Sequence, residues 1–345
     1  MPNVFDLVKA ENLKVMWESD TNRAPYIGEA FFPNKRQKGL KFGFIKGKQG
    51  VPVALVSANW NTNVLYRDRI GVEGLSGSLP FFKEAYKIDE ETRQEILSTK
   101  DEYLQSIIDR VFDDEMELLA GADVTAERMR MQLLSTGVIT IVENGVNKQY
   151  DYGFDADNQY KTLDTLWNDE NATPLADVYQ AKKDYKALTK KKASIMLISD
   201  SLFSKLANDK AVIDYFANLS TPNLYPSDEE IKTFIERKLE LTIVITEDEY
   251  IEARDFDGEA VPFYPENTFT LLSTYDLGET IYGTTPEEAD LLGGNSKASS
   301  VAVTSKGVAI TTWDEVDPVN VNTKVSEVCI PTCPNLDLIY IVKAL

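Results

Sequence analysis

The spacing of apolar residues predicts one helix that is much longer than any other in the chain. Apolar side chains recur at helical intervals between Leu97 and Leu119, after a candidate N-cap at Asp89. Gly121 is expected to end this helix, and a shorter helix is predicted from about Thr125 to Ser135. At 1.5 Å per residue the long helix would span roughly 45 Å. Its other face is acidic and carries Asp89, Glu90, Glu91, Glu95, Asp101, Glu102, Asp109, Asp113, Asp114, Glu115 and Glu117.

The residues before the long helix show no such order. Residues 1–38 lack clear periodicity, although the stretch from Pro25 to Pro33 is densely apolar and aromatic. We interpret this part as an extended arm that lies on another surface, such as a neighbouring chain. Residues 39–87 are strand-like and punctuated by glycine, which is typical of a long β-hairpin with little core of its own.

The chain after the long helix alternates between strand and helix patterns. A hairpin is predicted from Val138 to Phe154, because Asn144-Gly145 is a strong two-residue turn signal. An α/β rhythm then runs from residue 173 to residue 246, and this part is the best candidate for a separate domain. Its predicted elements are a helix opened by Thr173 and Pro174, a buried strand Ala193–Ser199, a helix from Asp200 to Leu206, a helix Lys210–Leu219, a helix opened by the capping box at Ser227, and a strand Leu241–Ile245.

The last part of the chain is rich in β-strand patterns. A turn is predicted at Ser305-Lys306-Gly307. The predicted strands are Thr268–Leu272, Thr280–Tyr282, Val301–Trp313 around that turn, and Leu338–Val342.

Composition removes most enzymatic chemistry. The 345 residues include 36 Lys and Arg, 56 Asp and Glu and no His, which gives a net charge of −20. Without histidine there is no Ser-His-Asp triad, no Cys-His pair and no His-ligated metal. The acid excess also disfavours a protein that grips nucleic acid over its whole surface. No apolar run approaches the ~18 residues of a membrane span, and the N-terminus lacks signal-peptide features, so we expect a cytoplasmic chain.

The remaining motifs carry little chemistry. No P-loop, Gly-x-Gly-x-x-Gly or Gly-x-Ser-x-Gly pattern is present. The acidic loops 151–157 and 255–259 do not match calcium-binding spacing, so we interpret them as solvated turns. Cys329 and Cys333 are expected to be small buried residues, and Lys190-Lys191-Lys192 to be a solvated helix end. A hydrolase using two carboxylates stays open as a minor alternative.

Arg67-Asp68-Arg69 lies within the predicted hairpin. Alternation places Arg67 and Arg69 on one face of the strand and Asp68 on the other. Charges at such a position often only keep strand edges apart. They could instead pair with another subunit, for example with the acidic face of the long helix.

Several strings resemble the tailed-phage major capsid protein E family, which includes the major head protein of phage lambda. Leu133-Leu134-Ser135-Thr136-Gly137 and Trp313-Asp314-Glu315 are similar to its middle and closing regions. The more specific strings are Pro25-Tyr26-Ile27-Gly28-Glu29-Ala30-Phe31-Phe32-Pro33 and Arg67-Asp68-Arg69-Ile70-Gly71, followed by Pro80-Phe81-Phe82. The resemblance covers essentially the whole chain.

The resemblance implies an α+β fold of the Hong Kong 97 phage capsid type. By analogy, residues 1–38 would be the N-terminal arm and residues 39–88 the extended E-loop hairpin. Residues 89–172 would form the P-domain with its long spine helix, and residues 173–255 the α/β A-domain. Residues 256–345 would supply the remaining β segments of the A- and P-domains.

The resemblance also implies a function by assembly. The protein would be the major capsid protein of a tailed phage, forming the hexamers and pentamers of an icosahedral shell in the host bacterial cytoplasm. Its partners would be portal and scaffolding proteins, a decoration protein, and packaged double-stranded DNA through proximity alone. We expect no catalytic residue, cofactor, metal or membrane contact, and the alternative is an encapsulin-like cellular nanocompartment. The expected subunit-interface residues are Tyr26, Phe31, Phe32, Phe42, Phe44, Arg67, Asp68, Arg69, Phe81 and Phe82.

Overall fold

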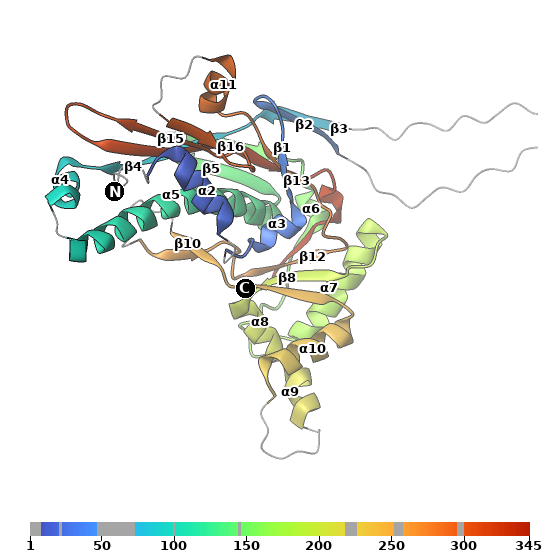
Figure 1. Cartoon of the computed structure of the whole chain (residues 1–345). Helices are drawn as coiled ribbons and strands as arrows, with labels where there is room; N and C mark the ends of the chain where they lie inside the picture. Colours follow the sequence, from blue (N-terminus) through green and yellow to red (C-terminus); the bar gives the residue numbers. More distant parts are fainter. Residues whose placement is uncertain are drawn as a thin grey trace, which may run out of the picture. The chain divides into compact units, whose positions relative to one another are not determined.

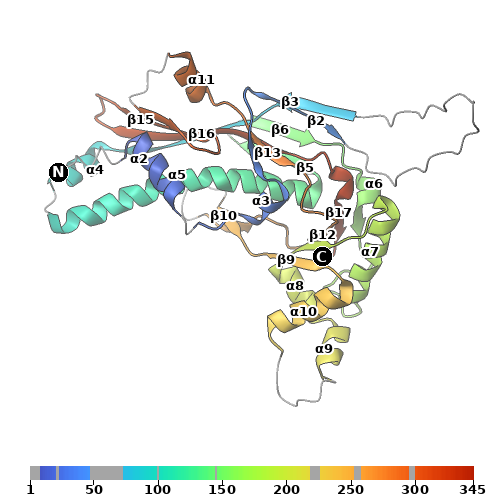
Figure 2. The same ribbon diagram turned by 45° about the vertical axis from the view of Figure 1, so that its right-hand side comes forward.

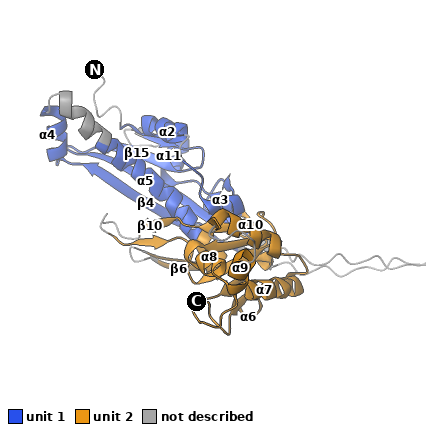
Figure 3. Ribbon diagram, turned by 90° about the horizontal axis from the view of Figure 1, so that it is seen from below, with its two compact units in different colours: residues 1–43, 76–129, 279–332 blue, residues 44–75, 130–278, 333–345 orange. Residues whose placement is uncertain are grey.

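The chain passes several times between two structural units. The structure, a computed structural model, describes residues 8–20, 23–46, 73–98, 101–143, 146–217, 226–251, 258–294 and 300–345. Unit 1 comprises residues 1–43, 76–129 and 279–332, and unit 2 comprises residues 44–75, 130–278 and 333–345 (Figure 3). Helix α5 (Asp101–Thr136) contributes to both units. No helix in these ranges is both long enough and apolar enough to cross a membrane. The division into arm, E-loop, P-domain, A-domain and closing segment stays a prediction.

Unit 1 is built on a sheet whose longest strand is β16 (Val321–Thr332). The strand order is β1 (Asn34–Arg36), β13 (Glu279–Tyr282), β16, β15 (Ala309–Asp314) and β14 (Ser300–Val303), and β4 (Phe81–Ile88) also pairs with β16 (Figure 1). The helices of this unit are α2 (Ala10–Ser19), α3 (Ile27–Phe31), α4 (Glu90–Ser98), α11 (Pro286–Gly293) and the first part of α5.

The two faces of β16 meet different helices. Val321 packs in a cluster with Val111 of α5, and Thr323 follows on the same face because side chains alternate along a strand. Lys324 and Ser326 point to the other face, where their side chains donate hydrogen bonds to Glu287 of α11. Helices α5 and α11 therefore lie on opposite faces of this sheet (Figure 1).

Unit 2 contains a mixed sheet with the order β7, β17, β12, β8 and β9. Trp167 stacks on Phe269 at 5.5 Å between ring centroids, and the buried Tyr185 hydroxyl donates to the Leu338 carbonyl at 3.1 Å. This unit also contains two short two-stranded sheets, β5–β6 and β10–β11 (Figure 2). The strands are β5 (Val138–Glu143), β6 (Val146–Asp151), β7 (Tyr160–Thr162), β8 (Ile195–Ser199), β9 (Thr242–Thr246), β10 (Glu249–Ile251), β11 (Ala260–Pro262), β12 (Thr268–Leu272) and β17 (Tyr340–Lys343). The helices are α6 (Ala156–Gln159), α7 (Pro174–Thr189), α8 (Asp200–Ala207), α9 (Lys210–Ala217) and α10 (Asp228–Leu239), with a 3₁₀ turn at Leu336–Leu338.

The predicted helix stop at Gly121 is wrong. Helix α5 continues through Gly121 to Thr136 and so joins most of the predicted long helix to the predicted short one, whereas residues 90–98 at the start of the predicted long helix form the separate helix α4. A glycine inside a helix costs about 1 kcal/mol relative to alanine, and burial of flanking side chains such as Leu119 and Met129 offsets that cost. The helix ends at Gly137 instead, whose φ of 74° is the left-handed conformation that favours glycine.

The N-terminal segment is not extended throughout, as we expected it to be, although its role as an arm stays a prediction. Helices α2 and α3 form there, and α2 buries Ala10, Leu13 and Trp17 at helical spacing. Helix α2 has only ten residues, and polar and apolar side chains alternate irregularly between its buried positions, so the sequence pattern indicates this helix only weakly. Strand β16 is a further element that the sequence pattern did not predict. It is buried on both faces and includes polar residues, so it shows no alternation.

Many local predictions are confirmed. Strands β5 and β6 pair in the register Glu143 to Val146, while the turn residues 144–145 lie outside the described residues. The capping box at Ser227 forms with both hydrogen bonds. Helix α8 starts as predicted, but Ser199 rather than Asp200 is its N-cap. The predicted turn joins β14 to β15, and β8, β9, β12, β13 and β17 lie at their predicted places. Strands β2 (Lys41–Lys46) and β3 (Glu73–Ser78) pair in the region of the predicted hairpin.

Candidate functional site

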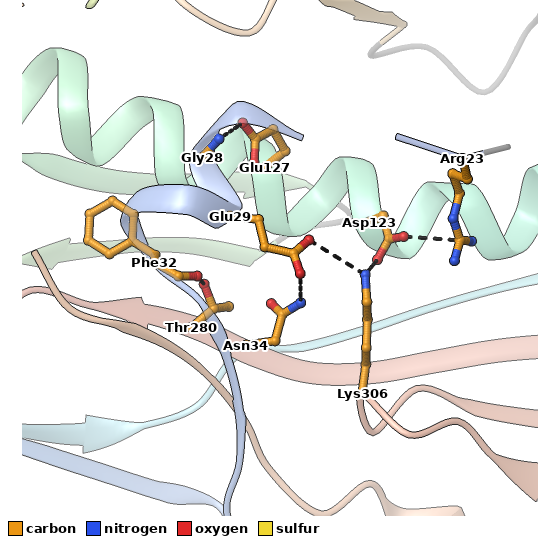
Figure 4. Close-up of polar contacts among 9 residues, drawn as sticks. All are labelled: Arg23, Gly28, Glu29, Phe32, Asn34, Asp123, Glu127, Thr280 and Lys306. Carbon is orange, nitrogen blue, oxygen red and sulfur yellow. Dashed lines mark hydrogen bonds and ion pairs between the residues drawn. The ribbon is translucent and has the colours of Figure 1, made fainter. Parts of the chain in front are cut away.

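The aromatic motif of the N-terminal segment packs inside its own subunit. Phe31 and Phe32 are fully buried in unit 1, and Tyr26 is half-buried. The Thr280 hydroxyl donates to the Phe32 carbonyl at 2.9 Å, and the Thr280 N–H donates to the Pro33 carbonyl at 3.0 Å (Figure 4). These contacts fasten the segment to strand β13. A single copy of the chain therefore already covers both phenylalanine side chains completely.

Polar contacts hold the same segment to helix α5. The Gly28 N–H donates to Glu127 Oε1 at 2.7 Å, and Glu127 is almost completely buried (Figure 4). Lys306 lies in the turn between β14 and β15, and its Nζ atom is 3.1 Å from Asp123 Oδ1 and 3.7 Å from Glu29 Oε2. These contacts join three separated parts of unit 1. We call this set the N-terminal latch; its members are Arg23, Gly28, Glu29, Asp123, Glu127 and Lys306.

The bonds of the latch differ in strength. The Gly28–Glu127 hydrogen bond is charge-assisted and buried, which makes it the strongest of the set. The ion pairs of Lys306, and that of Arg23 with Asp123 at 3.8 Å, are partly exposed, so each contributes at most about 1 kcal/mol. Arg23 also stacks on the Trp17 ring at 3.4 Å. We infer that Glu127 is the main anchor of the segment.

A cavity of about 320 Å³ opens beside the latch. Its charged lining consists of Arg23, Lys306, Glu29 and Asp123, which are engaged with one another. The cavity therefore offers no free acid and base for catalysis. No group of three or more metal-ligating side chains occurs among the residues that the structure describes.

The other predicted interface residues are spread over several elements. Phe42 of β2 is buried. Phe44 is half-buried, and its ring stacks on the Tyr152 ring with 5.6 Å between the ring centroids. Phe81 of β4 is 42% exposed, and its neighbour Phe82 is half-buried. Arg67, Asp68 and Arg69 lie outside the described residues. The described members of the predicted set thus lie on several elements of the two units, and their role in an interface stays a prediction.

Sequence reasoning missed several exposed apolar side chains. Val316 is 88% exposed, Leu292 of α11 is 75% exposed and Leu97 of α4 is 67% exposed. They lie on different segments, and single apolar side chains on a protein surface are common, so their exposure alone does not mark an interface. No pattern in the sequence separates them from core residues, because exposure depends on where each element lies.

The acidic face of α5 is not uniform. Glu117 is exposed, but Glu115 is only 2% exposed, so the acidic residues assigned to this face do not all lie on an exposed surface. Burial raises the pKa of Glu115 to about 7, and the nearby charge of Asp114 adds to the rise, although the Thr323 side chain acts in the opposite direction. Glu115 is therefore partly protonated near neutral pH.

Two minor predictions are confirmed. Cys329 and Cys333 are both completely buried. The three consecutive lysines lie at the end of α7, where Lys190 is the left-handed C-cap and Lys192 pairs with the exposed Glu240. The Lys182 ammonium group donates to the Leu239 carbonyl. These lysines act at a helix end, as expected for a local structural role.

Comparison with known families decides the identity. The family model described as "Phage major capsid protein E" matches residues 9–344. The chain belongs to the phage major capsid protein E family. It is a structural component of the phage virion capsid and not an enzyme. Many copies of a capsid protein associate, so contacts between copies are part of its function.

Solved structures support the same fold. The putative capsid protein of a prophage of Escherichia coli CFT073 is 13% identical, with a TM-score of 0.61, and the match covers 98% of this chain and 99% of that one. A phage-related protein from Bordetella bronchiseptica RB50 is 12% identical, with a TM-score of 0.56 and coverage of 98% and 97%. No curated protein matches significantly. The matches confirm a mixed α+β, Hong Kong 97-like capsid fold.

Proposed function

We propose that this phage major capsid protein assembles into hexamers and pentamers, which close an icosahedral shell around a double-stranded DNA genome. The family match over residues 9–344 is the observation that carries this proposal. Each contact between copies can be weak, since many contacts close the shell together.

We assign the parts of the chain by analogy with the capsid fold. Residues 1–38 act as the N-terminal arm and residues 39–88 as the E-loop. Residues 89–172 form the P-domain, with α5 as its spine, and the α/β stretch 173–255 forms the A-domain around the capsomer axis. Residues 256–345 complete both. The length of α5 and the alternation of helices and strands after Pro174 agree with this assignment.

The proposed interface differs in its parts. Phe81 is exposed and suits a direct contact with a neighbouring subunit, as do the partly exposed Tyr26, Phe44 and Phe82. The buried residues Phe31, Phe32 and Phe42 act indirectly, by fixing the segments that make contact. Arg67 and Arg69 pair with acidic residues of a neighbouring copy, and Asp68 lies between them.

The partners follow from a shell that is filled with DNA. We propose a separate scaffolding protein, a portal at one vertex, and a decoration protein on the outside. With a net charge of −20, the wall does not bind the DNA tightly, so the genome is enclosed rather than gripped.

Electron microscopy tests the proposal directly. The chain is expressed alone and together with a scaffolding protein from the same phage, and negative-stain images are expected to show rings or closed shells. A monodisperse monomer under both conditions would refute the proposal.

Charge reversal tests the arginine contact separately. The double variant Arg67→Glu and Arg69→Glu is expected to fold but not to form shells. The control makes the same charge change at Arg237 and Lys238, which are exposed in the last turn of α10. Shells formed normally by the first variant would remove both arginines from the interface.

An encapsulin-like nanocompartment is the alternative that the sequence pattern leaves open. The match to a phage capsid family favours the virion. Purified particles settle the point by their contents, because a virion head contains phage DNA whereas a nanocompartment contains a cargo enzyme.

A further inference from the structure

Glu115 interrupts the apolar stripe by which α5 packs on the unit 1 sheet. Val111, Leu118 and Leu119 are buried at positions i−4, i+3 and i+4 from it, and Glu115 itself is 2% exposed. Val111 packs with Val321 of β16, and Thr323 follows on the same face of that strand and interacts with the Glu115 side chain. A carboxyl group thus occupies a place where helix packing calls for an apolar side chain.

No positively charged side chain acts on Glu115 in the part of the chain that the structure describes, and only the Thr323 side chain favours its charged form. Its Oε2 atom is buried and has no hydrogen-bond partner among the described residues. The titratable groups around it are acids: Asp114 on α5, and Tyr86 on β4, whose pKa is raised first by burial and then by several carboxylates that include Glu115. Arg110 acts on Asp114 instead. Burying an unpaired charge is costly, so the neutral acid is the form that fits this site.

We propose that Glu115 is a proton-operated switch for the packing of α5 on β16. The protonated carboxyl group packs against Thr323 as a neutral side chain. When its proton leaves to solvent, an unpaired carboxylate remains inside the interface, draws in water and loosens this part of the helix. In a chain without histidine, a buried glutamate is the group that responds to pH near neutrality.

The direction of the effect follows from proton linkage. The pKa of Glu115 is about 7 in the folded protein and 4.5 in its ordinary state. The folded state therefore binds this proton more tightly, so the contribution of Glu115 to stability is fully present below about pH 4.5 and is lost as the pH rises to about 7. The difference corresponds to a change of up to ~300-fold in the unfolding equilibrium constant.

Hydrogen exchange of the unassembled subunit at pH 6 and pH 8 tests the switch. After correction for intrinsic rates, amides of residues 110–120 are expected to exchange faster at pH 8 in the wild-type protein. The variant Glu115→Gln, which is neutral at every pH, is expected to lose this difference. The matched control is Glu117→Gln, which removes the same charge two residues away at an exposed position and is expected to behave like the wild type.

The outcomes that overturn the proposal are clear. The proposal is refuted if amide exchange of residues 110–120 depends on pH equally in Glu115→Gln and in the wild type. It is also refuted if the control variant Glu117→Gln loses this pH dependence. If Glu115→Gln does not fold, infrared titration of the wild-type subunit replaces it. A carboxylic-acid C=O band that persists to about pH 7 supports the switch, and its disappearance by pH 5 refutes it.

Discussion

The substitution Gly28→Ala tests whether the N-terminal latch holds the subunit together. A Cβ atom at this position would lie 2.6 Å and 2.7 Å from the two carboxylate oxygens of Glu127. Glu127 is 1% exposed, so its carboxylate cannot swing into solvent to make room. The added methyl group must therefore break the hydrogen bond from the Gly28 N–H.

The magnitude follows from that bond. A hydrogen bond to a charged group contributes about 1.5–3 kcal/mol. Gly28 lies in α3, where alanine is intrinsically favoured over glycine by about 0.5–1 kcal/mol. The two effects oppose each other, and we expect Gly28→Ala to lower the free energy of unfolding by about 1–2 kcal/mol.

Gly121→Ala is the matched control, because it adds the same methyl group inside α5. Apart from the backbone and chain neighbours of its own helix, no atom of the described residues lies within 4 Å of a Cβ placed there. Only the helix propensity changes, so this variant is expected to gain about 0.5–1 kcal/mol. Urea unfolding of the unassembled subunit measures both changes, and limited proteolysis reports whether the segment around Gly28 is released.

The opposite signs make the test sharp. If both variants change stability in the same direction, the contact between Gly28 and Glu127 does not limit stability. If Gly28→Ala is as stable as the wild type and equally resistant to protease, the latch does not anchor the segment.

Three further predictions concern other parts of the chain. Ser227→Ala removes the capping box formed with Glu230 and is expected to cost about 1 kcal/mol in urea unfolding; an unchanged midpoint would contradict it. Burial raises the pKa of Tyr264 to about 12, so stability is expected to fall as the pH rises above 10, and ultraviolet titration that shows every tyrosine ionising near pH 10 in the folded protein would rule this out. Cys329 and Cys333 are expected to react with a thiol reagent only after unfolding, so labelling of the folded subunit would be inconsistent with their burial.

Local patterns predicted a large part of the fold. The capping box at Ser227, the hairpin around residues 144–145 and the stripe of α5 each depend on residues close in sequence. Such signals need only backbone hydrogen bonding and helical or strand periodicity. The family resemblance also came from short strings, and the match over residues 9–344 confirmed it.

The candidate site was harder to predict. Phe31 and Phe32 were expected at an interface because they stand in an apolar stretch without periodicity, yet the subunit buries both against elements more than two hundred residues away, such as Thr280. An apolar side chain has the same sequence signature whether its own subunit or a neighbour covers it. Only the tertiary structure distinguishes the two cases.

The sequence by itself determined that this protein acts without histidine chemistry, has one very long helix and belongs to a capsid family. The tertiary structure decided which face of that helix is buried away from solvent. Glu115 and Glu117 are two residues apart and equally acidic in sequence, but one is buried against β16 and the other faces water. The reason is physical: burial is a property of the pair of surfaces that meet, and long-range contacts choose that pair.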